Sequence, residues 1–479
     1  MVFLKRYIGI FVVLVLSFWA IKSFFIPGFF PMHDDTQVAR VFEMGKMLSS
    51  GIFPVRFVPD LGYGYGYPIF NFYAPLAYYI GGLFILLGFD ALIATKLMMI
   101  LGIIMSGIFM YLLAREFWGE VGGILSGIFY LYAPYHALDI YVRGDVAEFW
   151  AYAFIPLAFL GIYKRSIIIG SIGFAGIILS HNLTALMVTP FLLIAILLNC
   201  YIAPKGKKLL ILYRSSLILF LGLAVSAFYW IPALLEIKNT NIFSQIGGGA
   251  DFKDHFVCVS QLWDSLWGFG GSVRGCIDGL SLKIGKLHIL VSLAAIVLTI
   301  FVGKIRKSKQ GLIIILSFLG FLLSIFFTLE MSRFFWEAVP AMDFFQYPWR
   351  FLILASFFSS LLAGSLVYLS KQAGIKPYLV LSLVFFLLFF NVKLFTPQTI
   401  LHKTAENYTN EHALKWTASK ISDEFLPPNF KKPKNEKEVI KEPIPFKETP
   451  IEKTSNAVSL IGILALIIGI IFKYAKTKR

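Results

Sequence analysis

The residues with the clearest chemical potential form a short stretch, Pro31–Thr36, which holds His33, Asp34 and Asp35. It follows an apolar run from Tyr7 to about Phe25 that is long enough to cross a membrane. Ionisable groups beside a bilayer are costly and usually mark a functional path. The stretch therefore predicts a catalytic or binding site. A simpler interpretation is that Asp34 or Asp35 caps the next helix, since Asp accepts hydrogen bonds from first-turn N–H groups.

The composition excludes a soluble globular fold. Of the 479 residues, 58% are hydrophobic and only 15% are charged, whereas charged residues make up about a quarter of a typical soluble domain. The formal charge of +16 comes mostly from short Lys and Arg clusters between apolar runs. Such clusters mark the cytoplasmic ends of spans. We therefore expect a lipid bilayer, and no nucleic acid, as the partner of the basic residues.

Thirteen apolar runs are candidates for membrane spans, and the first should remain as a signal anchor. They lie near 7–25, 69–88, 92–113, 120–137, 149–163, 166–181, 184–201, 209–235, 287–303, 311–329, 350–369, 377–394 and 457–472.

If all thirteen runs crossed, the later basic clusters would fall outside the cell, against the positive-inside rule. The weakest candidate is 69–88, which contains Asn71 and Pro75 and starts with several tyrosines. We interpret it as a half-inserted juxtamembrane helix. The prediction is an all-α, polytopic protein of the cell membrane with about twelve transmembrane helices and both termini cytoplasmic. Its outer loops would be 26–91, 138–148, 236–286, 330–349 and 395–456.

Three regions follow from this topology: a transmembrane module at 1–394, a polar outer loop at 395–456, and a final helix with a basic tail at 457–479. The Lys, Glu and Pro content of 395–456 predicts a partly disordered tether with no packed enzyme domain. Within the first outer loop, helical spacing from Val38 to Leu48 predicts an amphipathic helix on the membrane surface. In loop 236–286, Cys258 and Cys276 are compatible with a disulfide or with free thiols.

The same topology gathers acidic groups on one face. Asp139, Arg143, Asp145 and Glu148 share the outer side with the Pro31–Thr36 stretch, and His136 and His181 end their spans there. Aromatic side chains crowd the outer loops, above all in Gly62–Pro68. One interpretation is an interfacial aromatic belt. The alternation with glycine instead favours stacking on sugar rings.

These features resemble the GT-C class of integral-membrane glycosyltransferases. Members carry acidic residues just outside the first span, here Asp34 and Asp35, and another acidic position in the next outer loop, here in Arg143–Glu148. They also have a half-inserted helix in the first loop.

Several phrases are similar to a bacterial and archaeal membrane family labelled "6-pyruvoyl-tetrahydropterin synthase related", although the sequence contains no soluble zinc-histidine enzyme domain. The phrases are His33–Asp35, Tyr67–Leu76, Arg143–Glu148, Ser180–Asn182 and Tyr347–Phe351.

The resemblance implies transfer of a sugar from a polyprenyl-phosphate donor to a lipid, glycan or protein acceptor on the outer face. Such chemistry needs a carboxylate base, for which Asp34 or Asp35 is suited, and Asp35 is favoured because it lies nearer the amphipathic helix. Cations must hold the phosphate, a role that fits Arg143 or Arg350. Further substrate-binding candidates are His33, Tyr67, Tyr73, Asp145, Glu148 and His181.

The metal requirement stays open at this stage. Asp145 and Glu148 would orient the acceptor or help to hold a divalent metal such as Mg²⁺ or Mn²⁺. A transition-metal site of His33, His136 and His181 is a further hypothesis, as is catalysis without a metal.

Two other functions compete with the transferase. A transporter or flippase would share the many spans, but it usually places charge near the bilayer midplane and shows internal repeats. The expected span centres here are nearly free of charge. A non-catalytic scaffold or lipid-carrier-binding protein of the same fold would keep the acidic residues without turnover.

Overall fold

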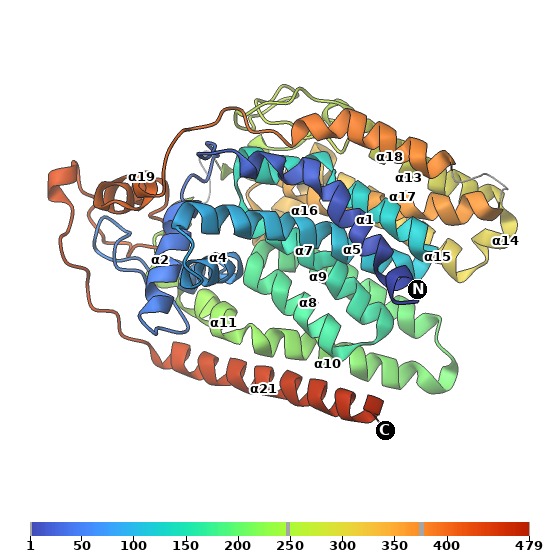
Figure 1. The fold of residues 1–479 in the computed structure, drawn as a ribbon, viewed down its shortest axis with the longest axis horizontal. Coiled ribbons are helices and arrows are strands. Elements are labelled where there is room, and N and C mark those ends of the chain that lie inside the picture. The colour runs from blue at the N-terminus through green and yellow to red at the C-terminus, as the bar shows by residue number, and fades with distance from the viewer. Residues whose placement is uncertain (1, 246–249, 373–377, 479) are drawn as a thin grey trace.

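The computed structural model describes residues 2–245, 250–372 and 378–478, and helices dominate it (Figure 1). Within these ranges, strand pairing is limited to isolated bridges such as that between Phe29 and Leu401. The predicted all-α, polytopic class is confirmed. Eight helices are long and apolar enough to cross a membrane. They are α1 (Val2–Ile21), α5 (Ala91–Leu131), α7 (Val146–Lys164), α9 (Asn182–Tyr201), α10 (Lys208–Val225), α15 (Lys309–Thr328), α17 (Leu352–Gln372) and α21 (Pro450–Lys478).

Helix α5 contains two of the predicted spans. At Gly119 the backbone leaves helical geometry, with φ 75° and ψ −177°, a combination that glycine adopts without steric cost. The two halves then lie against each other, because a Cβ at Gly127 would come within 2.8 Å of the Gly107 carbonyl oxygen. The runs 92–113 and 120–137 therefore form an antiparallel pair. The shorter apolar helices α8 (Ile167–Ser180), α13 (Lys286–Phe301) and α18 (Tyr378–Asn391) match three further predicted spans.

The run 69–88 is broken into α3 (Ile69–Phe72) and α4 (Leu76–Leu86). With 11 residues, α4 is only about 16 Å long, roughly half the thickness of the hydrocarbon core. It is also too short to count among the candidate spans. This length agrees with the prediction that 69–88 does not cross.

The predicted amphipathic helix is α2 (Gln37–Ser49). Most of its residues are buried by other parts of the protein, and only its C-terminal end is exposed. Its Val41 and Met44 pack against Gly81 and Gly82 of α4, at distances that only glycine allows there. The charged residues Arg40 and Glu43 of the same helix are also buried. Helix α4 therefore covers the apolar face of α2, which the sequence analysis directed toward the membrane.

The segment 395–456 packs along the first outer loop. Its Ile440 and Ile444 donate backbone hydrogen bonds to the carbonyl oxygens of Tyr63 and Tyr65, at 3.0 Å each. Ser422 accepts a hydrogen bond from Arg40, at 2.9 Å. We call residues 395–449 the strap. In Figure 1 the strap, with the short helix α19 (Glu406–Thr409), wraps the end of the bundle that carries α2 and α4. This packing differs from the partly disordered tether that the Lys, Glu and Pro content of the segment predicts.

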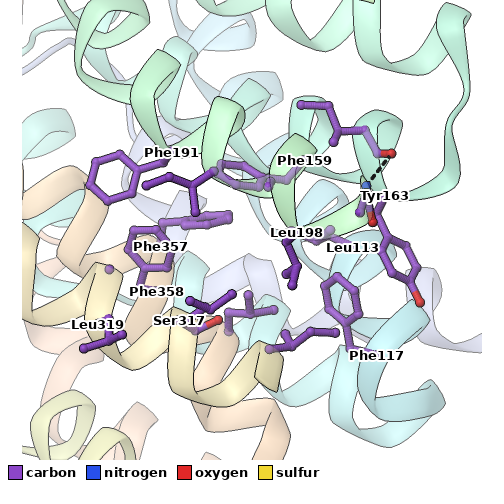
Figure 2. Close-up of a pocket in the computed structure, with 18 of the residues that line it drawn as sticks. Leu113, Phe117, Phe159, Tyr163, Phe191, Leu198, Ser317, Leu319, Phe357 and Phe358 are labelled. Atoms are coloured by element: carbon purple, nitrogen blue, oxygen red, sulfur yellow. Dashed lines mark hydrogen bonds between the residues drawn. The ribbon is translucent and has the colours of Figure 1, made fainter. Parts of the chain in front are cut away.

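Both termini lie at the opposite end of the bundle (Figure 1). We call this the termini end, and the end with α2, α4 and the strap the first-loop end. Between the two ends, α5, α7, α9, α15 and α17 enclose an apolar cavity of about 250 Å³ (Figure 2). Phe159, Phe191, Phe357 and Phe358 line it. Asn199 also lines it, but its amide donates to the Ile162 carbonyl oxygen at 3.0 Å, so the cavity suits apolar occupants.

The hairpin in α5 gives a topological prediction. In a variant whose native free cysteine is removed (Cys200→Ser), Asp90→Cys should react with a membrane-impermeant thiol reagent applied from outside. Arg115→Cys should react only after permeabilisation, because the first half of α5 carries position 115 to the termini end. Labelling of whole cells measures both. Reaction of Asp90→Cys only from the cytoplasm, with Arg115→Cys reached from outside, would contradict the topology.

Candidate functional site

Two chain segments meet at the first-loop end because of one sharp turn. After α6 (Pro134–Leu138), residues Asp139–Arg143 form a single wide π-helical turn that ends at Gly144 in a left-handed conformation (φ 63°). Any Cβ at Gly144 would collide with the side chain of Met32. The backbone N–H groups of His33 and Asp34 donate to the carbonyl oxygens of Val142 and Arg143, at 3.0 Å each. The two acidic stretches predicted to share a face are therefore joined directly.

Arg143 is at the centre of the buried charges. Its guanidinium is paired with Asp139, with Asp145 at 2.7 Å and with Glu148 at 3.0 Å. Burial and the neighbouring Glu148 raise the pKa of Asp139 well above its ordinary value. For Asp145, burial acts in the same direction, but Arg143, His181 and Arg350 outweigh it and hold its pKa at about 2. Asp145 is thus a permanently ionised carboxylate, and it also caps α7 by accepting from the Glu148 N–H.

Above Arg143 lies a polar cavity of about 290 Å³. Its walls carry two carboxylates, two guanidinium groups, two imidazoles and two aromatic rings. The residues that supply them are Asp34, Asp145, Arg143, Arg350, His33, His255, Tyr347 and Trp349. Asp34 and Asp145, which come from the two acidic stretches predicted to share a face, both line this cavity.

Asp34 is the more basic of the two carboxylates that line this cavity. Burial, followed by the negative charge of Asp145, raises its pKa to about 6, against the opposing influence of Arg40 and Arg143. A carboxylate with this pKa is mostly ionised at neutral pH and still accepts a proton more readily than an exposed one.

Arg350 enters the cavity from the start of α17, where the short turn Pro348–Phe351 precedes the helix. The residue is 8% exposed, and its nearest carboxylate oxygen is that of Glu148, 3.7 Å from Nε. Nε and Nη1 are buried and donate no hydrogen bond to any part of the chain that the structure describes. Since unsatisfied buried donors are rare and costly, these two point to an anionic ligand.

Aromatic rings hold both arginines in place. Arg143 lies 4.6 Å from the centre of the Trp349 ring, and Arg350 lies 5.4 Å from that of Tyr347. The two rings stack on each other at 4.9 Å. The stretch Tyr347–Phe351 thus supplies two stacked rings, Tyr347 and Trp349, and one cation, Arg350.

The loop between α11 (Ala227–Glu236) and α13 closes the cavity from above. His33 contacts the Phe269 carbonyl oxygen through Nε2 at 3.1 Å, and Trp349 donates to Ser272 at 3.1 Å. Cys258 and Cys276, whose pairing the sequence left open, form a disulfide in this loop. The crosslink restrains the loop that contributes His255, Gly271 and Ser272 to the cavity wall.

Asp35 lies on the other side of the chain. It is absent from the cavity wall. The charge nearest to it is Lys403 of the strap, which opposes the rise in pKa that burial causes. Adjacent residues with β-like or turn geometry point in different directions, and here only Asp34 faces Asp145. The preference for Asp35 as the base is therefore not supported by the geometry, which favours Asp34.

The tyrosines proposed to stack on sugars contact the protein itself. Tyr67 is fully buried, with its hydroxyl 3.2 Å from that of Ser422. Tyr63 and Tyr65 pack against Phe430 of the strap. Tyr73, by contrast, lies with its ring 4.6 Å from the Arg40 guanidinium. Asp34 and Asp145 add to the effect of burial in raising its pKa, so Tyr73 borders the acidic site whereas Tyr67 does not line the cavity.

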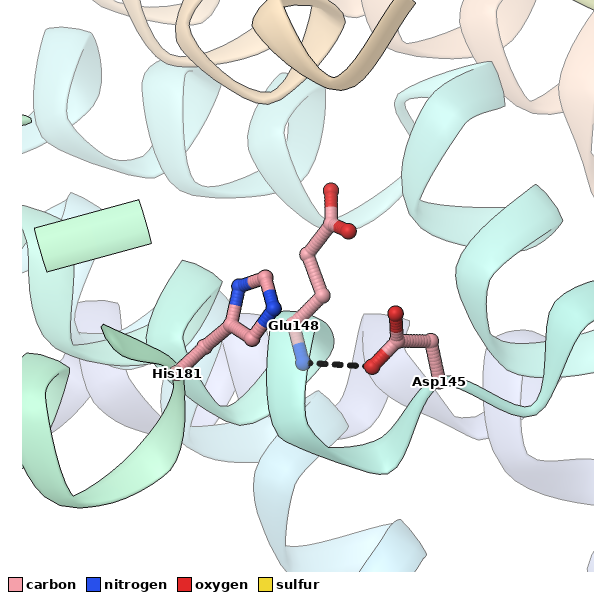
Figure 3. Close-up of side chains that lie close together, drawn as sticks. All are labelled: Asp145, Glu148 and His181. Carbon is pink, nitrogen blue, oxygen red and sulfur yellow. Dashed lines mark hydrogen bonds between the residues drawn. The ribbon is translucent and has the colours of Figure 1, made fainter. Parts of the chain in front are cut away.

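The three histidines of the hypothetical transition-metal site do not meet. His136 stacks on Tyr152, and its Nδ1 lies 2.9 Å from the Leu131 carbonyl oxygen. His33 is held by the loop above the cavity. His181 instead joins Asp145 and Glu148, and one ligand atom from each residue lies within 4.8 Å of the others (Figure 3). Burial lowers the pKa of His181 to about 4 despite the two carboxylates, so its imidazole is neutral and able to bind a metal.

Two charged residues near Asp34, namely Arg40 and Glu424, were not among the site residues predicted from the sequence. Arg40 belongs to α2, where its helical position suggested an exposed face. Glu424 belongs to the strap, and its charge acts on both Asp34 and Arg40. No local pattern marks either residue, because each is brought to the site by contacts between the first outer loop and the strap.

No known family profile matches the chain. An uncharacterised protein of Lactococcus lactis subsp. cremoris is 25% identical over 253 residues, which cover 49% of this chain and 41% of that protein. Among solved structures, the oligosaccharyltransferase of Archaeoglobus fulgidus, tethered to an acceptor peptide with the NVT sequon, matches with a TM-score of 0.54 and 13% identity.

That match covers 94% of this chain and 62% of the archaeal protein, so the chain spans less than two thirds of its structural neighbour. The chain has the fold of an integral-membrane oligosaccharyltransferase. The arabinofuranosyltransferase AftD from Mycobacteria also matches, with a TM-score of 0.49, 13% identity and coverage of 83% of this chain and 27% of that one. The match to the archaeal structure shows a shared fold, as the predicted polytopic architecture requires.

The buried network predicts a large stability effect at Arg143. Arg143→Met should lower the free energy of unfolding by roughly 3–5 kcal/mol, because it leaves several buried carboxylates without their cation. Arg333→Met is the matched control, since Arg333 pairs with Glu330 and Glu337 at the surface and its loss should leave the melting temperature almost unchanged. Thermal unfolding in detergent measures both. Equal melting temperatures for the two variants would contradict the central role of Arg143.

Proposed function

We propose that this protein is a membrane glycosyltransferase that takes a sugar from a polyprenyl-phosphate donor and passes it to an acceptor on the outer face of the membrane. The observation that carries the proposal is the buried side chain of Arg350, which has two nitrogens without a hydrogen-bond partner among the described residues and lines the same cavity as Asp34. One group suits a leaving phosphate and the other suits an attacking hydroxyl.

The guanidinium of Arg350 matches the phosphate end of the donor. Its planar donors bind phosphate oxygens in pairs, and the ring of Tyr347 fixes its direction. Arg143 is already shared among three carboxylates, so its role is to organise the site. Of the two arginines considered from the sequence, Arg350 is therefore the phosphate ligand in this proposal.

Asp34 would act as the base. The acceptor O–H loses its proton to the Asp34 carboxylate while its oxygen forms a bond to the anomeric carbon of the sugar. The bond between that carbon and the donor phosphate breaks, and the lipid phosphate leaves with the electron pair. Arg350 then stabilises the charge that develops on the phosphate, which is where fixed cations accelerate transfer. Tyr347 and Trp349 line the same cavity and hold the two guanidinium groups in place.

A divalent metal fits the residues Asp145, Glu148 and His181. Their ligand atoms converge, His181 is neutral, and Asp139, Asp145 and Glu148 outnumber the two guanidinium groups that face them. The donor set of two carboxylates and one imidazole favours Mn²⁺ over Mg²⁺. When bound, such an ion would supply positive charge to polarise or orient an oxygen ligand.

The archaeal oligosaccharyltransferase was solved with a tethered acceptor peptide, and a protein acceptor is one option here beside a lipid or a glycan. The finer resemblance to the family labelled "6-pyruvoyl-tetrahydropterin synthase related" rests on the sequence phrases quoted above. An outward-facing site with both termini in the cytoplasm likewise rests on the distribution of basic clusters.

The proposal separates two adjacent carboxylates. Asp34→Asn should reduce turnover by about 10²–10⁴-fold, because it removes the proton acceptor while keeping the side-chain size. Asp35→Asn is the matched control and should retain near-normal turnover, since Asp35 faces Lys403 outside the cavity. The measurement is transfer from a panel of polyprenyl-phosphate sugars by the protein in nanodiscs.

If both folded variants keep near-normal turnover, the base is misassigned. If the wild-type protein binds the donors but transfers none of the panel, the non-catalytic lipid-carrier-binding alternative gains support.

The metal site has a readout that does not depend on activity. Saturating Mn²⁺, at about 100 times its Kd, should raise the melting temperature of the EDTA-treated protein, equivalent to about 2.7 kcal/mol of stabilisation. Asp145→Asn should abolish the rise. Asp264→Asn, which removes an exposed acid paired with Lys286, should preserve it. A rise that survives Asp145→Asn would place the ion elsewhere.

A further inference from the structure

A second polar pocket lies at the termini end of the bundle, away from the cavity described above. Helix α7 begins at the Asp145 cap and ends at Lys164, so the residues that follow it are a full helix length from the candidate site. The pocket has a volume of about 470 Å³ and lies between the start of α8, α10 and α21. Its polar residues are Lys164, Arg165, Ser166 and Arg214.

Two of these cations have no counter-charge among the residues that the structure describes. Nε of Arg165 is buried without a hydrogen-bond partner. Neither Arg165 nor Arg214 forms an ion pair with the described residues, whereas their neighbour Lys164 pairs with Glu116 at 2.8 Å. Arg214 is also unusual in its position, because it lies within an apolar span that begins at Lys205. An arginine at such a depth is costly unless it meets water or an anion.

The backbone of Arg165 adds an independent observation. It ends α7 in a left-handed conformation, with φ 56° and ψ 32°, at a position that glycine usually occupies. A long side chain at such a position carries a conformational cost that glycine would avoid. Residues kept in unfavourable backbone conformations often serve a ligand, and here the side chain borders the pocket.

The first turn of α8 contributes further positive potential. This helix has 14 residues, and Ser166 caps it by accepting from the Ile169 N–H at 3.4 Å. The N-terminal end of a helix attracts anions through its dipole and its free N–H groups. Together with Arg165 and Arg214 it makes the pocket a site for a negatively charged group.

The remaining walls are apolar, and they open between two helices. Helix α21 packs tightly on α10 near Gly462, where a Cβ would come within 3.0 Å of Ala224. Two turns later, a Cβ at Gly469 would meet no described atom within 4 Å. The helices have therefore separated at this depth, and Leu221 and Leu466 line the gap. An acyl chain fits such a gap, whereas a free inorganic anion gains nothing from it.

We propose that this pocket binds the phosphate of an anionic phospholipid, with Arg165, Arg214 and the first turn of α8 around the headgroup and an acyl chain between α10 and α21. Basic pockets between transmembrane helices bind anionic headgroups in this way. The lipid would join the last helix to the rest of the bundle at the end where direct packing is missing.

Native mass spectrometry tests the proposal. The protein is exchanged into detergent containing equal amounts of phosphatidylglycerol and phosphatidylcholine, and retained lipid is counted. The wild-type protein should retain phosphatidylglycerol on the order of tenfold more than phosphatidylcholine, since each nearby cation favours an anionic lipid. Arg165→Gln with Arg214→Gln should remove this preference. Lys205→Gln with Lys207→Gln is the control, because both residues are exposed at the same end but outside the pocket.

A second readout separates binding from folding. Phosphatidylglycerol should raise the melting temperature of the wild-type protein and of the control. Arg165→Gly should melt at or above the wild-type temperature without lipid, because glycine suits the left-handed position, yet its gain from phosphatidylglycerol should be smaller. The proposal fails if the arginine variants keep the wild-type preference, if neither lipid is preferred, or if inorganic phosphate alone gives the same stabilisation.

Discussion

The buried guanidinium of Arg143 constrains the whole first-loop end. A charge taken out of water is tolerated only with close counter-charges and satisfied hydrogen bonds, and Arg143 finds these in Asp139, Asp145 and Glu148. To bring three carboxylates around one side chain within ten residues, the chain makes a wide π-helical turn and reverses at Gly144. The same turn leaves two carbonyl groups free to dock the segment that carries Asp34.

Adjacent residues of identical type acquire different properties in this setting. Asp34 and Asp35 have the same intrinsic acidity, and the sequence offers only their order along the chain to distinguish them. Burial next to Asp145 raises the pKa of Asp34 to about 6, whereas Asp35 faces the cation of Lys403. Environment, set by residues more than a hundred positions away, therefore decides which carboxylate is suited to take a proton.

Patterns local in sequence predicted much of the fold. Apolar runs located the helices, and the basic clusters argued against a crossing at 69–88. The two acidic stretches were expected on one face, and of their carboxylates Asp34 and Asp145 line one cavity whereas Asp35 and Glu148 do not. Arg350 was also among the candidates. These successes share a cause, since span length, charge and helix periodicity are properties of neighbouring residues. The contacts of Tyr67 and Arg40 were missed because their partners, such as Ser422, lie more than 350 residues further on.

The strap is more ordered than its composition predicts. Its Lys, Glu and Pro content is typical of disorder, yet a few apolar side chains anchor it, with Phe425 and Leu426 buried. This arrangement has a consequence for biosynthesis. The first outer loop is made early, but the residues that cover Tyr67 are made near the end. At about 5–20 residues per second, the loop waits on the order of tens of seconds for its cover. During that interval Arg40 and Tyr67 lack the strap contacts that cover them in the folded protein.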